Sequence, residues 1–500
     1  MALASPAAPV AAVPEPSAAR ESAVILLTTI GTLMVAVDST IVILALPTMT
    51  RELHANLSSV IWAILLYLLV TAAFTTQSGR LGDMLGRAPI YNLGFVIFTV
   101  GSLFAGLSPN VTILNVSRAV QAIGGSLIFA NSGALIAAAI PPVRRGRAFG
   151  YLVFGWSVGA ILGVLLGGAI TTLIGWRYIF FINLPIGVVA VALGLRTLPK
   201  TERVRTGFDI PGFVSFSAML TLICYGAIEV AVYGSGLAYF GYLLAGLVLV
   251  PVFVVAELRA KEPMLDLHQL KDRLLSFSLL AGFLQAAGYL AVIFLLTMYL
   301  QGIRGLSPLD ASLLLVPGYL LGALTGPFFG RRISQYGARG LATAGILLMA
   351  GAVLVYATMD QSTWLGLIPI VSVVTGIGSG MFYPANNTAI MGQATPETFG
   401  AISGLRATLS NMGTLISFVL AITIASASVP RAVAYQVFLG VGGSIGALSG
   451  PFLSGIHAAL IGSAIVLGLA ALLSWSRGPG NAPHTAPRPA GAPPLAPGGP

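Results

Sequence analysis

Long apolar runs alternate with short polar segments along almost the whole chain. A helix needs about 20 apolar residues to cross the hydrocarbon core of a bilayer, because it rises only about 1.5 Å per residue. Runs of this length occur fourteen times, and we expect spans near 24–47, 59–79, 89–108, 112–138, 148–173, 178–197, 210–231, 237–256, 275–300, 308–329, 341–359, 364–391, 402–427 and 455–475. The sequence therefore predicts an all-α membrane protein with fourteen transmembrane spans.

Three segments fall outside this pattern. Residues 1–20 are rich in Ala and Pro, and residues 477–500 form a Pro/Gly/Ala tail of low complexity, so we expect both to be disordered cytoplasmic segments. The Gly/Ser-rich stretch 428–454 suits either a long loop or an extra partial span. The first apolar run is too long for the core of a signal peptide, so we expect it to remain as the first span.

The composition supports a membrane protein and excludes a soluble one. Hydrophobic residues make up 56% of the chain and charged residues only 8%, whereas soluble domains carry about 25% charged residues. The same values exclude disorder of the whole chain. Cys224 is the single cysteine and the four histidines are scattered, so we expect no disulfide framework, no metal site and no cofactor.

The basic residues predict the orientation in the membrane. A net charge of +10 would suit a nucleic-acid partner only if it were clustered on a solvated face, but Lys and Arg lie between the apolar runs, so no such partner is expected. With the N-terminus in the cytoplasm, nineteen basic residues fall on that side and four on the other, as the positive-inside rule requires. An even number of spans then places both termini in the cytoplasm.

The second half of the chain repeats features of the first half. Three pairs recur in the same order at an offset of roughly 250 residues: the Gly/Arg loop 79–87 with 330–339, Ala130-Asn131 with Ala385-Asn386, and Phe149-Gly150 with Phe399-Gly400. The repeat predicts two six-helix bundles, over 21–198 and 275–476, with two inserted helices between them over 199–274. Two such halves around a cavity are the layout of an alternating-access carrier.

Asp38 places a carboxyl group in an otherwise apolar span. Such a group costs about 2.5–3.5 kcal/mol at the bilayer centre, so it must be protonated, paired or in contact with water. Hydrocarbon surroundings favour the protonated form, which makes Asp38 a candidate for taking up a proton from one side and releasing it to the other. An acid held structurally by a neighbouring helix is the alternative.

Arg118, in the fourth span, is the candidate partner of Asp38. Asp38 lies about 21 Å from the inner end of its span, and Arg118 lies about 9 Å from the outer end of its own. In a core of about 30 Å these depths coincide, so an ion pair is geometrically allowed. Alternatively, Arg118 snorkels to the interface or donates to backbone carbonyls.

Glycine-containing motifs and buried amides add further candidates. The loop residues Gly79, Asp83, Gly86 and Arg87 could form a gating latch, or they could belong to an ordinary positive-inside loop. A ridge at four-residue spacing in the fifth span predicts a tight helix contact and comprises Gly155, Gly159, Gly163, Gly167 and Gly168. Five amides are candidates for the substrate cavity, with interhelical hydrogen bonds as the alternative role: Gln121, Asn131, Asn386, Asn387 and Asn411.

In this order the motifs resemble the major facilitator superfamily, and within it the fourteen-span drug:proton antiporter branch, over about residues 22–475. Asp38 to Val42 with Ala45 to Pro47 resembles the first-span signature of the branch, and Gly79 to Arg87 resembles the loop motif of the superfamily. Arg118 with Gln121 and Gly124 resembles the fourth-span motif implicated in proton transfer. Two further segments are similar to the fifth-span antiporter motif and its sequel: Gly163, Gly167 and Gly168, and Gly175-Trp176-Arg177 through Asn183-Leu184-Pro185. The chain departs from the family pattern at Ile43, Met84 and Val164.

The resemblance implies a carrier of the major-facilitator type, not an enzyme, that acts as a monomer in the plasma membrane (the bacterial inner membrane). It implies export of hydrophobic or amphipathic small molecules (drugs, antibiotics or secondary metabolites) in exchange for protons, with Asp38 and Arg118 as the proton-coupling residues and the proton gradient in place of a cofactor. A uniporter or proton symporter for a metabolite, lipid or siderophore would share the fold. A membrane-embedded transferase or scaffold is a remote alternative, because the sequence shows no paired acids or histidine set in a loop.

Overall fold

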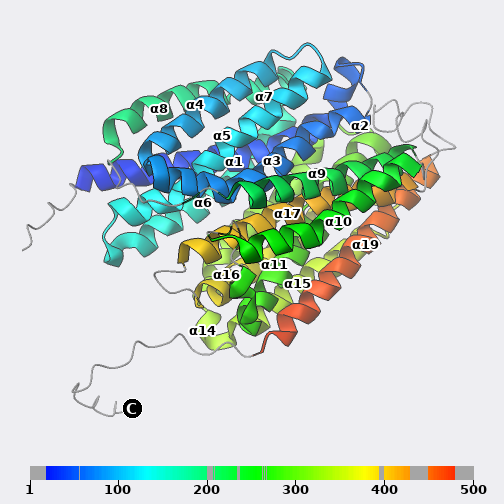
Figure 1. The fold of residues 1–500 in the computed structure, drawn as a ribbon. Coiled ribbons are helices and arrows are strands. Elements are labelled where there is room, and N and C mark those ends of the chain that lie inside the picture. The colour runs from blue at the N-terminus through cyan, green and yellow to red at the C-terminus, as the bar shows by residue number, and fades with distance from the viewer. Residues whose placement is uncertain are drawn as a thin grey trace, which may run out of the picture.

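Fourteen helices of the protein are long and apolar enough to cross a membrane, and the predicted fold class is confirmed (Figure 1). The computed structural model describes residues 18–55, 57–199, 207, 209–233, 237–261, 263, 265, 267–393, 399–427 and 449–478. The disorder expected over 1–17 and 479–500, and most of the ambiguous stretch 428–454, lie outside the described residues. The first helix begins at Ala18, so the last three residues of the predicted N-terminal tail are helical.

The first six spans pack together in an N-terminal bundle, which occupies the upper part of Figure 1. Short helices α2 (Leu57–Val60) and α7 (Tyr178–Phe181) lie between the spans. The spans are α1 (Ala18–Glu52), α3 (Trp62–Leu85), α4 (Arg87–Gly106), α5 (Val111–Ala139), α6 (Pro142–Leu173) and α8 (Asn183–Thr197).

The inserted helices form a hairpin that packs on α3 and on the C-terminal bundle through α17. The hairpin comprises α9 (Ile210–Tyr233) and α10 (Leu237–Arg259) and is followed by the 3₁₀ turn η1 (Leu267–Lys271). The C-terminal bundle contains α11 (Arg273–Tyr289), α12 (Val292–Thr297), the π-helical turn η2 (Met298–Ile303), α13 (Pro308–Gly330), α14 (Ile333–Tyr336), α15 (Ala338–Tyr356), α16 (Leu367–Met391), α17 (Phe399–Ala427) and α19 (Ser449–Ser476). The predicted span 275–300 is thus three consecutive helical segments, interrupted around Leu290.

Corresponding helices of the two bundles pack in the same way. The α1–α6 contact corresponds to α11–α17, α4–α5 to α15–α16, and α4–α8 to α15–α19. The equivalent asparagines of α5 and α16 use different helices: Asn131 donates to the carbonyl of Ser78 on α3, and Asn386 donates to the carbonyl of Ser278 on α11, each at 3.1 Å. The parallel arrangement expected from the repeated motifs therefore appears in the packing.

The bundles meet at one end of the molecule and at mid-height. We call the end where α1 begins the proximal end and the end where α1 finishes the distal end. At the distal end Gln301 Nε2 donates to the carbonyl oxygen of Leu44 at 3.1 Å, and near mid-height the hydroxyls of Thr76 and Thr408 lie 2.6 Å apart. Toward the proximal end, Phe154 on α6 and Phe328 on α13 are exposed. The bundle contacts therefore close the distal end.

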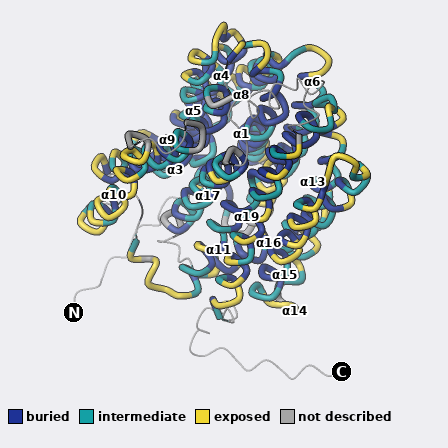
Figure 2. Tube along the Cα trace, turned by 90° about the vertical axis from the view of Figure 1, so that its right-hand side faces the viewer, coloured by how far each residue is buried: buried dark blue, intermediate teal, exposed yellow. Residues whose placement is uncertain are grey.

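The outward faces of the spans are apolar and exposed, as lipid-facing surfaces must be. Figure 2 shows exposed residues along α10 and buried residues where the helices face one another. The span in α10 is one of the least buried, because only 17% of the residues in its apolar stretch are buried by the rest of the protein. The hairpin therefore lies at the edge of the helical assembly, with one side turned to the bilayer.

Candidate functional site

A buried ion pair joins α1 to α5 in the distal half of the N-terminal bundle. Asp38 Oδ2 lies 2.6 Å from Arg118 Nη1. The exposed fractions of the two side chains are 0% and 1%. The contact that the predicted depths allowed is therefore present, and both charges are shielded from solvent and lipid in this conformation.

Neighbouring polar groups complete the hydrogen bonding of the pair. Gln121 lies one helical turn after Arg118 on α5; its Oε1 accepts from Arg118 Nη1 at 2.5 Å, and its Nε2 donates to Asp38 Oδ1 at 2.7 Å. Arg118 Nε donates to the backbone carbonyl of Ala63 at 2.9 Å. Ser102 on α4 accepts hydrogen bonds from Gln121 at 2.8 Å and from Asn183 at 3.3 Å. Both carboxylate oxygens of Asp38 thus have donors, so this arrangement stabilises the ionised form.

Aromatic rings enclose the guanidinium group of Arg118. Its central carbon lies 4.2 Å from the ring centroid of Tyr67 and 5.7 Å from that of Phe180. Rings at these distances attract a cation electrostatically and exclude water. Ser102, Tyr67 and Phe180 could not be predicted from the sequence, because a serine and two aromatic residues in apolar spans carry no motif or spacing signal.

The glycine ridge packs α6 directly against α1, the helix that carries Asp38. A Cβ atom at Gly159, Gly163 or Gly167 would lie 2.6 Å from a backbone carbonyl oxygen of α1, so only glycine fits. The carbonyls belong to Leu33, Val37 and Ile41, and Gly155 faces Thr29 in the same way. Gly168 instead faces Pro308 and Ser312 of α13, so the distal end of the ridge contacts the opposite bundle.

The loop between α3 and α4 is held by an ion pair across its glycine turn. Gly86 has a φ of 100°, which side-chain-bearing residues rarely adopt. Arg87 Nη2 lies 2.8 Å from Asp83 Oδ1, and Arg87 Nη1 donates to the carbonyl of Ala134 at 2.9 Å. Asp83 therefore lies against a basic neighbour. These contacts lie within the N-terminal bundle. A Cβ atom at Gly79 would meet no other atom within 4 Å.

The five amides proposed for the substrate cavity divide into two groups. Gln121, Asn131 and Asn386 are buried within single bundles, so in this conformation they do not line a space between the bundles. Asn386 accepts from Arg477 at 2.9 Å, so its polar group is used in an interhelical hydrogen bond. Buried amides are usually hydrogen-bonded within the protein, and a role of these three in the substrate cavity stays a prediction.

The other two amides lie on the C-terminal bundle and are half-buried. Asn411 Nδ2 lies 3.4 Å from Thr75 Oγ1, across the junction of the bundles, and Asn387 Oδ1 lies 3.4 Å from Arg406 Nη1. Their role in substrate binding stays a prediction.

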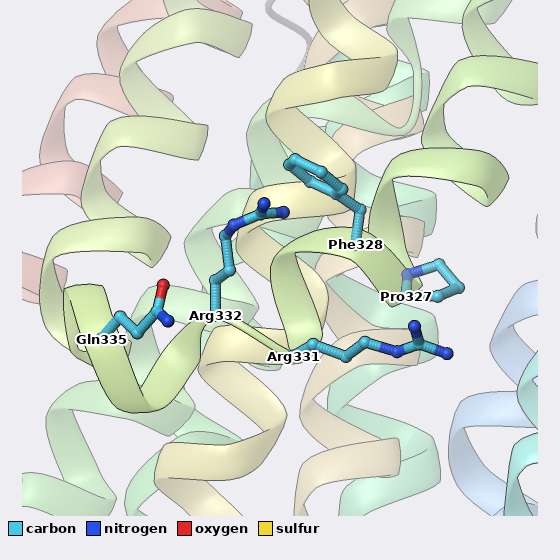
Figure 3. A pocket seen from close by; sticks show the side chains of 5 residues that line it. All are labelled: Pro327, Phe328, Arg331, Arg332 and Gln335. Atoms are coloured by element: carbon cyan, nitrogen blue, oxygen red, sulfur yellow. The ribbon is translucent and has the colours of Figure 1, made fainter.

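An open pocket of about 530 Å³ lies at the proximal end of α13, away from the ion pair. Figure 3 shows Arg331 and Arg332 extending from the end of that helix, with Phe328 and Pro327 above them and Gln335 opposite. The guanidinium of Arg332 stacks 3.7 Å from the ring centroid of Phe328. Within the described part of the chain, no three His, Cys, Asp or Glu side chains are grouped to hold a metal ion.

Comparisons with known proteins agree with this fold. Residues 28–418 match the family model of the Major Facilitator Superfamily. The riboflavin transporter RibZ of Clostridioides difficile (strain 630) is 31% identical over 391 residues, which cover 78% of this chain and 85% of RibZ. The tetracenomycin C resistance and export protein of Streptomyces glaucescens is 31% identical over 405 residues, 79% of this chain and 74% of that protein.

The structural comparison gives the same fold. A bacterial homologue of the human lysosomal transporter Spinster, crystallised in an inward-facing and unoccupied conformation, superimposes with a TM-score of 0.65 at 17% sequence identity, covering 92% of this chain and 98% of the other. The family match extends over most of the chain and includes the helices that carry Asp38 and Arg118. The chain is therefore a multi-pass membrane protein that belongs to the Major Facilitator Superfamily of transporters, which are not enzymes.

Proposed function

We propose that the protein exports hydrophobic or amphipathic small molecules in exchange for protons, by alternating access of the two bundles. The supporting observation is the fully buried Asp38–Arg118 ion pair, because an intramembrane acid paired with an arginine marks an ion pathway. Similarity to an antibiotic resistance and export protein supports the substrate class. Proton antiport would supply the driving force without any chemical conversion of the substrate.

Protonation of Asp38 is the proposed coupling step. A neutral carboxyl group no longer attracts the guanidinium of Arg118, which keeps its hydrogen bonds to Gln121 and to the carbonyl of Ala63. The helix α1 would then be released from α5. Leu44 lies about 9 Å further along α1 and accepts the distal hydrogen bond from Gln301 of the opposite bundle. A shift of α1 would therefore reach the contact that closes the distal end.

Substrate binding and protonation would bias the same equilibrium in opposite directions. A ligand shifts a conformational equilibrium only by its differential affinity for the two states. If substrate favours the conformation with the ion pair formed, its binding expels the proton from Asp38, and protonation in turn weakens substrate binding. The glycine ridge holds the backbones of α1 and α6 in close contact, so a shift of α1 would be transmitted to α6.

The proposed orientation places the proximal end in the cytoplasm of a plasma membrane, with the protein acting as a monomer. Among the described residues, the helix ends and turns at the proximal end carry Arg80, Arg87, Arg331, Arg332 and Arg339. At the distal end, Arg177 pairs with Glu52 at 3.1 Å, which neutralises part of the smaller positive charge there. This distribution follows the positive-inside rule.

Proton movement in inverted membrane vesicles tests the proposal. Vesicles would be acidified inside, candidate drugs added, and proton release followed with a pH-sensitive dye. We expect release with the wild type and with Asp360→Asn, which alters an exposed distal loop, but not with Asp38→Asn. Unchanged release in the Asp38 variant would remove this residue from the coupling mechanism.

A metabolite carrier of the same fold is the second candidate, because RibZ, the 31%-identical relative, is named for riboflavin transport. Export driven by antiport moves protons opposite to the substrate, symport moves both in one direction, and uniport moves no protons. Parallel measurement of dye response and radiolabelled riboflavin uptake therefore separates the two candidates.

A further inference from the structure

Two buried carboxyl groups meet at the proximal end of the inserted hairpin. Asp209 precedes α9 and Glu257 lies in the last turn of α10; their exposed fractions are 7% and 2%. The two acids form no pair in the sequence, because they are far apart in the chain and only the hairpin brings them together. Asp38 and Arg118 lie toward the other end of the molecule, so these carboxyls form a separate feature.

One oxygen of each carboxyl group has a backbone donor. Asp209 Oδ1 accepts from the amide of Gly212 at 2.9 Å, and Glu257 Oε2 accepts from the amide of Leu265 at 2.9 Å. The remaining oxygens, Asp209 Oδ2 and Glu257 Oε1, both contact the position that a Cβ atom of Gly212 would occupy. The two carboxyl groups therefore turn their second oxygens toward the same point.

Two buried hydrogen-bond acceptors lie near this point. Glu257 Oε1 is buried and meets no hydrogen-bond donor among the described residues, and the same holds for Gln77 Oε1 on α3. Gln77 Nε2 donates to the backbone carbonyl of Asp209 at 3.5 Å, so its amide lies beside the pair. A buried acceptor without a donor is destabilising, and a hydrogen placed between the two carboxyl groups would supply the missing donor to Glu257 Oε1.

A positive group of α3 lies beside the pair. Arg80 of α3 donates to the carbonyls of Gly207, just before the hairpin, and Pro263, just after it. Its guanidinium also interacts electrostatically with Glu257. The apolar cluster that packs on the hairpin includes Leu275 of α11 and Ile402 and Leu405 of α17, and α17 also carries Arg406, which contacts Asn387. Lys261 and His268, which follow α10 along the chain, are exposed.

We propose that Asp209 and Glu257 form a second proton-binding site, in which one proton is shared between their facing oxygens. Two carboxylates that face each other in a buried site cannot both ionise without strong repulsion, so one proton is retained near neutral pH. The protonated pair closes the base of the hairpin and, through Gln77, fixes it to α3. Loss of the proton leaves two like charges there and loosens the attachment.

The site adjoins the junction of the two bundles. Gln77 follows Thr76, whose hydroxyl contacts Thr408 of the C-terminal bundle at 2.6 Å. The inserted hairpin packs on both α3 and α17, the helices that form this junction. Protonation of the pair therefore regulates how tightly the hairpin is attached to the two bundles. This regulation is the same for any transported substrate and for either direction of transport.

Infrared spectroscopy of the purified full-length protein tests the proposal directly. A protonated carboxyl group gives a carbonyl stretch that is separate from the amide bands and disappears when the proton is removed by raising the pH. We expect this band in the wild type at neutral pH and its loss in both Asp209→Asn and Glu257→Gln. Each amide still offers an oxygen to its backbone donor. Glu229→Gln, on the same hairpin, and Asp38→Asn are the matched controls and should keep the band.

Thermal unfolding gives a second readout. A folded state that binds a proton the unfolded chain does not hold loses stability as the pH rises. The melting temperature of the wild type should therefore fall as the pH rises from the ordinary pKa of a carboxyl group, about 4, to the pKa of the folded pair, and the double variant Asp209→Asn/Glu257→Gln should lack this component. A wild type without a protonated carboxyl band at neutral pH, or a band that persists in both single variants, would overturn the proposal. Stabilisation by Na⁺ but not by choline at fixed pH would show a cation site instead.

Discussion

Replacement of Arg118 by Gln should destabilise the protein more than any comparable change on a lipid-facing surface. The guanidinium donates to Asp38, to Gln121 and to the carbonyl of Ala63, and it lies 4.2 Å from the ring of Tyr67. The substitution leaves a buried carboxylate without its charge partner. Because the Asp38 side chain is fully buried in this conformation, bulk solvent cannot replace the lost interactions.

The expected magnitude follows from the burial of the pair. Removal of one partner from a buried ion pair costs about 3–5 kcal/mol, because the remaining charge is uncompensated. Replacement of both partners by neutral residues that hydrogen-bond to each other costs much less. Arg118→Gln should therefore cost about 3–5 kcal/mol, and Asp38→Asn/Arg118→Gln should recover a large part of that loss.

The assay is a double-mutant cycle on thermal or denaturant unfolding of the purified protein in one detergent. The coupling energy between the two positions should be at least about 1 kcal/mol, in the range seen for residues in contact. The cost of the single Arg118 variant should fall at low pH, where Asp38 takes up a proton. Additive effects of the two substitutions, or a cost below about 1 kcal/mol for Arg118→Gln, would refute the assignment of a dry, energetically important pair.

Three further predictions concern positions outside the ion pair. Gly163→Ala should cost about 1–3 kcal/mol of unfolding free energy, because its Cβ atom would meet the backbone of α1; Gly150→Ala on the same helix meets nothing within 4 Å and should be neutral or slightly stabilising. Gly86→Ala should cost about 1–2 kcal/mol in the same unfolding assay, because φ at this position is 100°. Hydrogen bonds from Ser362 and Thr363 hold the pKa of Asp360 below its ordinary value. Asp360→Asn should therefore lower the melting temperature at neutral pH, and this difference should vanish as the pH falls through the lowered pKa. A difference in melting temperature that persists in acid would contradict this explanation.

The fold could be predicted from the sequence because the bilayer imposes a simple rule. Fourteen apolar runs of sufficient length required fourteen helices, and all were found near the expected positions. The contact between Asp38 and Arg118 could be anticipated from depth alone, since the membrane fixes how far each residue lies along its helix. The glycine ridge predicted close packing, but the identity of its partner, α1, depends on the arrangement of helices in the bundle.

The remaining features depend on lateral arrangement, which no one-dimensional pattern encodes. Ser102 completes the ion-pair network only because α4 lies beside α5 at that height. Asp209 and Glu257 come together through the register of the inserted hairpin. Asn131 and Asn386 were assigned to a cavity because polarity in a span marks either a cavity or an interhelical hydrogen bond, and only the packing distinguishes the two.

Proton release on substrate binding, measured without a membrane or a gradient, tests the central claim most directly. Purified protein in lightly buffered detergent would be mixed with a compound that it binds, and the pH change would be followed with an indicator dye at a pH where Asp38 is partly protonated. The account predicts that the wild type releases protons in proportion to the bound compound and that Asp38→Asn binds the compound without releasing any. Equal release by the two proteins would contradict it.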